Sequence, residues 1–247
     1  ARKNTRRRDA EVSDREKEEQ WYQGGKDKKT ALKAMKTDPL YQLNSDEKAS
    51  LWKYKELLKQ KEGFPALPKL LRSVNWTLSY EVRAMMRILP GWKWPEKKQE
   101  LLQLLDLSYQ CLPVRNFAVE GIRQMTDNEI ASCLPQLVQA LKYDVYDMSE
   151  LGVFLIERAI VQPALIGIPF FWCCKVEFRS AHCRGRYAKY IHEYKLRCGK
   201  QQLTLLDRQD RLWSETGVFQ KVAAAVYAQK GKSKSKILET LHMQLEG

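Results

Sequence analysis

The chain has 247 residues, of which 44% are hydrophobic and 30% are charged, a composition typical of a globular protein and unlike that of a disordered chain. Only 12 Gly and 9 Pro are present, so turn signals are too few for an all-β sandwich or barrel, and a helical fold is favoured. The net charge of +13 is concentrated at both ends, because residues 1–36 hold 12 Lys/Arg against 7 Asp/Glu and residues 184–236 hold 13 against 4. Such segments attract nucleic acid, anionic lipid or acidic proteins, and charge alone does not separate these partners.

The most apolar stretch, residues 152–174, does not predict a membrane span, because Glu157 and Arg158 interrupt it. The Arg-rich start has no apolar core behind it, so a secretory signal is not expected, and Ala1 in place of Met suggests a trimmed chain. Six cysteines spread over a long chain favour reduced thiols. We therefore expect a cytoplasmic protein.

Residues 1–25 mix charges without apolar periodicity, which is typical of a flexible linker, and a short helix over residues 28–35 is expected to follow. Residues 1–36 are therefore assigned to a basic linker with a lead-in helix, and the packed helical domain is expected over residues 37–247. Ser45 resembles a helix N-cap, because the acidic Asp46 and Glu47 follow it in the first turn.

Farther along, apolar residues recur at three- and four-residue spacing, which predicts amphipathic helices, and prolines at 65, 68, 90, 95, 113 and 135 are expected between helices or at their first turns. The segment Val114–Ile122 has a VRxxAxxxI pattern and is followed by a helix opening at Asp127–Glu129. This pattern resembles HEAT-type repeats, in which a small residue such as Ala118 lets helices approach closely. We predict an all-α, HEAT-like α-α superhelix, or α-solenoid, of about five helical pairs.

Motifs for nucleotide binding and phosphoryl transfer are missing from the sequence. Neither GxxxxGK nor GxGxxG occurs, and the Asp-Arg pairs at 207–208 and 210–211 are not followed by DFG. Ion pairs on a helix surface explain these Asp-Arg pairs better than a kinase catalytic loop does. We therefore expect no nucleotide site in this chain.

A group of cysteines and histidines in the last third of the chain could be considered as zinc ligands: Cys173, Cys174, His182, Cys183, His192 and Cys198. No CxxC knuckle is present, and adjacent cysteines rarely bind one ion together, so small half-buried side chains on helices are favoured over a metal site. The two histidines and Cys198 could also supply a base and a nucleophile, but nothing in the sequence orients them. No metal, cofactor or catalytic residue is expected here.

An aromatic stripe lies at helical spacing among basic residues, and it consists of Tyr187, Tyr190, Ile191 and Tyr194. Aromatic side chains between Lys and Arg can stack on unpaired bases. A stripe at this spacing is also the usual buried face of an amphipathic helix, and we favour that interpretation.

Eight strings resemble the helical, or accessory (PIK), domain of phosphoinositide 3-kinases, and they occur in the order that this family has. The resemblance is clearest over residues 26–175, and its structural motif residues here are Trp52, Trp76, Arg115, Ala118 and Trp172. The strings are TDPL (37–40), DEKASLW (46–52), LPKLLRSVNW (67–76), LLD (104–106), VRNFAVEGI (114–122), LPQLVQALKYD (134–144), SELGVFLIERA (149–159) and IGIPFFW (166–172).

The resemblance implies a helical scaffold between a lipid-binding C2 domain and a lipid kinase domain, with kinase signatures expected beyond Gly247. The parent protein would use ATP and Mg to phosphorylate the 3-position of inositol lipids, and this chain would be scaffold rather than catalyst. The implied partners are the C2 and kinase domains, a regulatory subunit and, through the parent, an anionic membrane. Location would be cytoplasmic and peripheral to the membrane, and nucleic acid is not an expected partner.

The resemblance does not resolve the enzyme class. The lead-in DKKTALKAMKTDPLYQL resembles class I, which we prefer, whereas LPQLVQALKYDVY and GWKWP are equally like class II. In class I chains, acidic residues near the start of the first helix face an inhibitory SH2 domain, and the matching positions here are Gln42 and Ser45. The resemblance thus implies a regulatory-partner surface at Gln42, Ser45, Asp46 and Glu47, but not inhibition by SH2.

The alternative from another class is a free-standing HEAT-like adaptor. The basic segment 184–236 would then bind RNA or an anionic surface, and the affinity would fall as salt is added, because neutralised phosphates release counterions.

Overall fold

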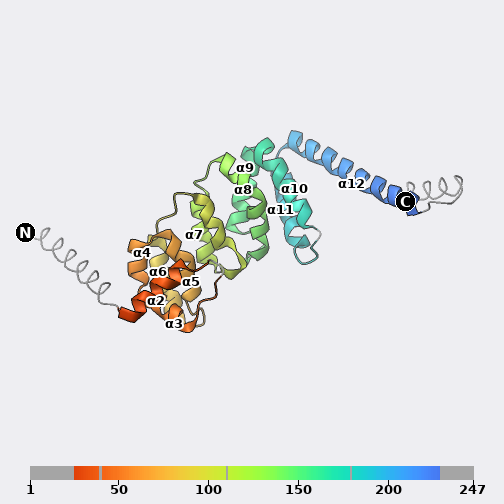
Figure 1. Cartoon of the computed structure of the whole chain (residues 1–247). Helices are drawn as coiled ribbons and strands as arrows, with labels where there is room; N and C mark the ends of the chain where they lie inside the picture. The colour runs from red at the N-terminus through yellow and green to blue at the C-terminus, as the bar shows by residue number, and fades with distance from the viewer. Residues whose placement is uncertain (1–24, 39–40, 110, 179, 229–247) are drawn as a thin grey trace, which may run out of the picture. The chain divides into compact units, whose positions relative to one another are not determined.

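The structure is a computed structural model that describes residues 25–38, 41–109, 111–178 and 180–228, with only the backbone described over residues 215–228. All regular elements in these ranges are helical, which confirms the predicted all-α class, and Figure 1 shows them in chain order. The α-helices are α2 (Gly25–Lys36), α3 (Ser45–Lys53), α4 (Lys55–Lys61), α5 (Leu67–Ser73), α6 (Ser79–Ile88), α7 (Leu112–Ile122), α8 (Asp127–Ala140), α9 (Glu150–Val161), α10 (Ile168–Glu177), α11 (Arg184–Arg197) and α12 (Lys200–Ala228).

Short 3₁₀ and π turns connect several of these helices. The 3₁₀ turns are η1 (Phe64–Ala66), η2 (Leu89–Gly91), η3 (Lys98–Leu105), η4 (Leu107–Tyr109) and η5 (Leu141–Tyr143), and η6 (Pro163–Gly167) is a π turn. None of the helices in the described part of the chain is long and apolar enough to cross a bilayer. The linker predicted over residues 1–25 lies outside the described residues except for Gly25, where α2 begins.

Among the described residues, α3 and α8 begin with a capping box, in which the N-cap side chain and the third helical residue satisfy each other's backbone N–H groups. In α8 the pair is Thr126 and Glu129, so the predicted opening of this helix is confirmed. In α3 the N-cap is Asn44, paired with Glu47, and Ser45 is the first helical residue. The prediction that Ser45 is the N-cap is therefore wrong by one position, because the side-chain oxygen of Asn44 accepts the hydrogen bond from the backbone N–H of Glu47.

The prolines mostly follow the sequence prediction, with one exception. Pro65, Pro68, Pro90 and Pro113 lie at the first positions of helical turns, where the missing N–H is tolerated. Pro135 instead lies inside α8, so its predicted place between helices is wrong. The helix continues through it because buried residues on both sides, among them Leu134 and Leu137, hold α8 in place.

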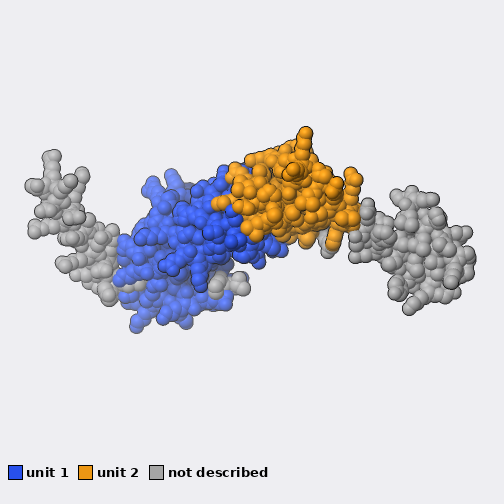
Figure 2. Space-filling model, turned by 90° about the horizontal axis from the view of Figure 1, so that it is seen from above, with its two compact units in different colours: residues 1–155 blue, residues 156–247 orange. Residues whose placement is uncertain are grey.

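The chain divides into two compact units, residues 1–155 and 156–247, which Figure 2 colours separately. Each unit has its own buried core. In the first unit the core includes Leu51, Leu58, Leu70, Val114, Ala118 and Leu155, and in the second it includes Phe170, Phe171, Tyr187, Tyr190 and Tyr194. The lead-in helix α2 packs on α3 and buries Ala31 and Ala34. The domain boundary after residue 36 stays a prediction.

Gly121 of α7 packs closely against Leu101 of η3 and against Trp94. A β-carbon on Gly121 would clash with Leu101 of η3 and lie 2.9 Å from the Trp94 ring. The Trp94 indole also donates a hydrogen bond of 3.2 Å to the carbonyl of Phe117, and its ring packs on Phe117 at 6.0 Å between centroids. Ala118 is completely buried, as a small core residue should be, but the clash at Gly121 identifies the position that sets the helix spacing.

Candidate functional surface

The predicted partner surface lies at the start of α3. Gln42, Ser45 and Asp46 are exposed there. Glu47 is only 6% exposed, because its carboxylate accepts a 2.9 Å hydrogen bond from the Asn44 N–H and one of 3.5 Å from the Tyr41 hydroxyl. Placing Glu47 on the surface is therefore wrong: it orients the first turn of α3, which carries Ser45 and Asp46, while Gln42 lies before the N-cap.

A lysine beneath this surface was not singled out by the sequence analysis. Lys69 of α5 is 8% exposed, and its ammonium donates to the carbonyls of Ala34, Met35 and Thr37 at 2.8, 3.0 and 2.5 Å. Burial lowers the pKa of Lys69 below that of an ordinary lysine. In the sequence, Lys69 stands within the apolar string LPKLL, beside leucines that are buried. A lysine inside such a string was the sequence signal that could have identified it as a buried residue.

A second buried cluster is centred on Arg115, one of the motif residues. Its guanidinium donates to Oδ1 of Asp144 at 2.5 Å, to the carbonyl of Leu105 at 2.7 Å and to that of Ala140 at 3.0 Å. The Ser149 hydroxyl donates to the other Asp144 oxygen and accepts from the N–H of Gly152 in the first turn of α9. Arg115 is 2% exposed, so this cluster ties η3, α8 and the start of α9 together from inside.

The three motif tryptophans have different surroundings. Trp52 is half-buried, with the Lys55 ammonium 4.7 Å from its ring centroid. Trp76 lies in the turn between α5 and α6 and is 40% exposed, so it is not a core residue. Trp172 of α10 donates a 2.9 Å hydrogen bond to Gln209 and packs edge-on against Trp213, with 5.7 Å between ring centroids. Among these three tryptophans, Trp172 is therefore the one that connects two helices, α10 and α12.

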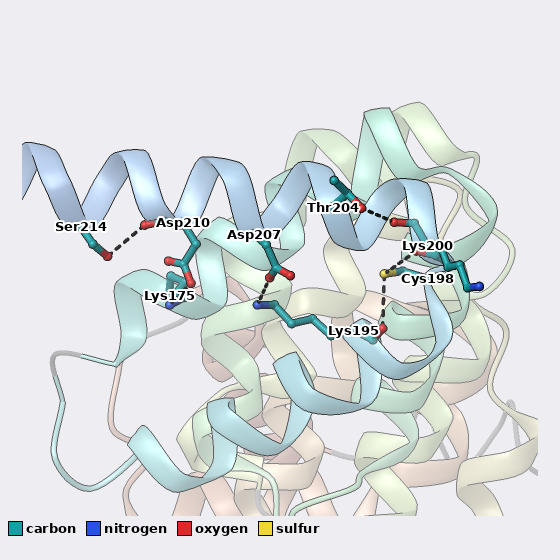
Figure 3. Close-up of polar contacts among 9 residues, drawn as sticks. Lys175, Lys195, Cys198, Lys200, Thr204, Asp207, Asp210 and Ser214 are labelled. Atoms are coloured by element: carbon teal, nitrogen blue, oxygen red, sulfur yellow. Dashed lines mark hydrogen bonds and ion pairs between the residues drawn. The ribbon is translucent and has the colours of Figure 1, made fainter.

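Ion pairs join the start of α12 to α10 and α11, as Figure 3 shows. Lys175 reaches Asp210 and Lys195 reaches Asp207, each with 2.8 Å between nitrogen and oxygen. These are the aspartates of the two Asp-Arg pairs. Both are therefore ion-paired on a helix surface, as the sequence analysis favoured, although their partners come from neighbouring helices rather than from α12 itself.

The aromatic stripe of α11 is buried, as predicted. Tyr187, Tyr190, Ile191 and Tyr194 all face the core, and Tyr194 packs edge-on against Phe170 with 5.8 Å between centroids. Burial raises the pKa of Tyr187, and it raises the pKa of Tyr194 to about 12. These rings could stack on bases only if the core opened. The aromatic stripe therefore does not support RNA binding.

The cysteines considered as zinc ligands are all free thiols. Cys174 is buried and Cys173, Cys183 and Cys198 are half-buried, and burial raises the pKa of Cys173, Cys174 and Cys198. A high pKa disfavours the thiolate that would bind metal or attack a substrate. Over the described ranges, no three His, Cys, Asp or Glu side chains are grouped so that they could hold a metal ion.

The described residues thus form an all-helical module whose buried polar side chains connect helices to one another. Comparison with known families gives its identity: the chain matches the model for the phosphoinositide 3-kinase family, accessory domain (PIK domain), over residues 21–207. The chain belongs to this family.

Three relatives from Dictyostelium discoideum are similar to the chain. Phosphatidylinositol 3-kinase 2 is 35% identical over 211 residues, which is 85% of this chain and 11% of that protein. Phosphatidylinositol 3-kinase 3 is 39% identical over 151 residues, covering 61% of this chain and 9% of the relative. Phosphatidylinositol 3-kinase 1 is 32% identical over 189 residues, covering 75% and 12%. The chain therefore spans only a small part of the length of these relatives.

Proposed function

We propose that this chain is the helical scaffold of a phosphatidylinositol 3-kinase, spacing a C2 domain from the lipid kinase domain and offering a surface to a regulatory partner. The observation that carries the proposal is the family match over residues 21–207. The parent enzyme would supply the ATP and Mg site and the contact with an anionic membrane. A HEAT-like solenoid would give the scaffold its length, because stacked helix pairs contact only their neighbours.

The buried clusters support a spacer role. Arg115 joins the ends of η3 and α8 to α7, and Trp172 joins α10 to α12, in both cases by directed hydrogen bonds, which resist sliding more than apolar contacts alone do. Charged side chains in the described part of unit 2 pair across helices, as Lys175 and Lys195 do. A scaffold needs helices that are fixed to one another in this way in order to transmit the position of one neighbouring domain to the other.

Two assays on the purified chain test the scaffold proposal. In calorimetry with ATP and Mg²⁺ we expect no heat of binding, and with phosphatidylinositol vesicles and ATP we expect no phosphorylated lipid. The parent protein, assayed in parallel, should phosphorylate the lipid. Lipid phosphorylation by the isolated chain, or an inactive parent, would contradict the proposal.

The partner surface is tested separately with an isolated SH2 domain from a class I regulatory subunit. A basic surface gains affinity from acidic side chains that face it. We therefore expect weak or no binding to the natural chain and measurable binding after Gln42→Glu and Ser45→Glu are combined. Gln60→Glu, at an exposed glutamine of α4, is the matched control and should leave binding unchanged. An equal gain in SH2 binding from the α3 substitutions and from Gln60→Glu would show a general charge effect. It would contradict a partner surface at the start of α3.

A further inference from the structure

The lead-in helix α2 ends against a buried ammonium. Besides the three carbonyl groups of Ala34, Met35 and Thr37, the Lys69 ammonium donates to the Thr37 hydroxyl at 2.9 Å, and that hydroxyl donates to the Ala34 carbonyl at 2.7 Å. The last carbonyls of a helix have no partner within the helix and carry partial negative charge. Lys69 therefore occupies the position of a cationic C-cap, but it is supplied by another helix.

The other contacts that hold α2 are weaker. Its fully buried side chains are Ala31 and Ala34, which remove little apolar surface from water, while Leu32 and Met35 are half-buried. Its ion pair, Asp27 with Lys53 of α3, has both side chains more than half exposed. Exposed pairs of this kind contribute little to stability because water screens them. The four acceptors that share the three N–H groups of the Lys69 ammonium are thus the most extensive polar attachment among the described contacts of α2.

The same contacts continue into the surface at the start of α3. Thr37 directly follows α2, and the Tyr41 N–H donates to the Asp38 carbonyl at 3.0 Å. The Tyr41 hydroxyl in turn donates to Glu47 in the first turn of α3. In Figure 1, α2, α3 and α5 lie together in the red and orange part of the chain. The position of α2 is therefore connected to that of α3 through a short run of hydrogen bonds.

We propose that Lys69 is the lock of a conformational strap: α2 is a separately releasable helix that packs on α3, and the buried ammonium of Lys69 holds its C-terminal end on α5. A partner or domain that acts on the chain before Gly25 draws α2 away only by breaking these bonds. Release of α2 uncovers the Lys69 ammonium and breaks its bonds to Thr37. Thr37 then changes position together with α2. The strap operates within the first unit and does not depend on lipid kinase activity in the parent protein.

Hydrogen exchange of the full 247-residue chain tests the lock. Lys69→Met keeps the aliphatic stem and removes the ammonium, so the α2 amides should exchange about tenfold faster or more, while the amides of α7 and α8 stay protected. Lys59→Met is the matched control, because the Lys59 ammonium also donates to a carbonyl near a helix end, that of Ile88, at 3.1 Å, but does not bind α2. It should leave exchange in α2 unchanged.

Two results would overturn the lock. One is unchanged exchange of α2 in Lys69→Met, and the other is an equal rise in α2, α7 and α8, which would make Lys69 an ordinary core residue. If Lys69→Met does not fold, Thr37→Val decides, because it removes the hydroxyl acceptor and leaves the three carbonyls. It should raise exchange by a smaller factor, confined to α2, and no rise there would equally reject the strap.

Discussion

The hydroxyl group of Tyr194 lies directly against Gly167, so that any β-carbon at Gly167 would collide with the phenolic oxygen and lie 2.7 Å from the carbonyl oxygen of Ala159. Gly167 ends the π turn η6, and Tyr194 comes from the buried face of α11. The backbone at Gly167 is right-handed helical, so the glycine is needed for space and not for an unusual dihedral angle. This contact fixes how closely α11 approaches the start of α10.

Gly167→Ala should therefore destabilise the chain by about 1–3 kcal/mol, because the added methyl overpacks the contact. Gly185→Ala is the control: it lies in α11 with no atom within 4 Å of the added β-carbon, and it should stabilise the helix by about 0.5–1 kcal/mol. Urea unfolding measures both. Adding Tyr194→Phe should recover part of the Gly167→Ala loss but not the part due to the Ala159 carbonyl. Strict additivity of the two changes would show that the residues are not in contact.

The buried phenol of Tyr194 also predicts an alkaline instability. Because burial raises its pKa from 10.0 to about 12, the unfolded chain loses this proton first as pH rises. The neutral phenol's contribution to the free energy of unfolding is complete below about pH 10. It is lost between about pH 10 and 12, at up to about 1.4 kcal/mol per pH unit. The free energy of unfolding of Tyr194→Phe should fall less steeply in this range. Tyr80→Phe, at a tyrosine that is 62% exposed, should keep the natural slope.

Ala118 provides a test of the core of α7 against the surface of α3. Ala118→Leu should cost about 1–3 kcal/mol, because the larger side chain has no free volume at a fully buried site. Gln42→Lys and Ser45→Lys should each stay within about 0.5 kcal/mol, because both positions are exposed. Thermal unfolding followed by circular dichroism distinguishes them. A similar drop in melting temperature for all three would mean that the exposed face of the first turn of α3 has been misplaced.

Arg115 should be far more sensitive than an exposed arginine. Arg115→Met leaves the Asp144 carboxylate buried without its cation, which should cost about 3–5 kcal/mol. Combining it with Asp144→Asn should recover stability, because the neutral amide can still accept the bond from Ser149. Arg123→Met breaks the half-exposed pair with Glu150 and should cost less than about 1 kcal/mol. Denaturant unfolding of the three variants and the natural chain gives these differences, and equal losses at Arg115 and Arg123 would contradict the buried-pair argument.

Sequence patterns predicted the helical class and the buried stripe of α11, since both depend on local apolar spacing that survives in the folded chain. They also placed Ala118 in the core. They failed where a distant partner decides the role of a residue. Glu47 looked like a surface carboxylate, but Asn44 and Tyr41 enclose it. Gly121 carried no local pattern, and Lys69 was marked only by its place in the apolar string LPKLL. Their roles depend on Trp94 and on the end of α2, which are distant along the chain.

The buried cluster at Arg115 also bears on how this chain folds. Its acceptors at Leu105, Ala140 and Asp144 are 10, 25 and 29 positions away along the chain. Bringing such residues together closes only short loops, so the entropy lost before the bonds form is small. We therefore expect η3, α7 and α8 to assemble early around the guanidinium, and the transition state of folding to contain this contact already. Substitutions at Arg115 would then act mainly on the folding rate and leave the unfolding rate nearly unchanged.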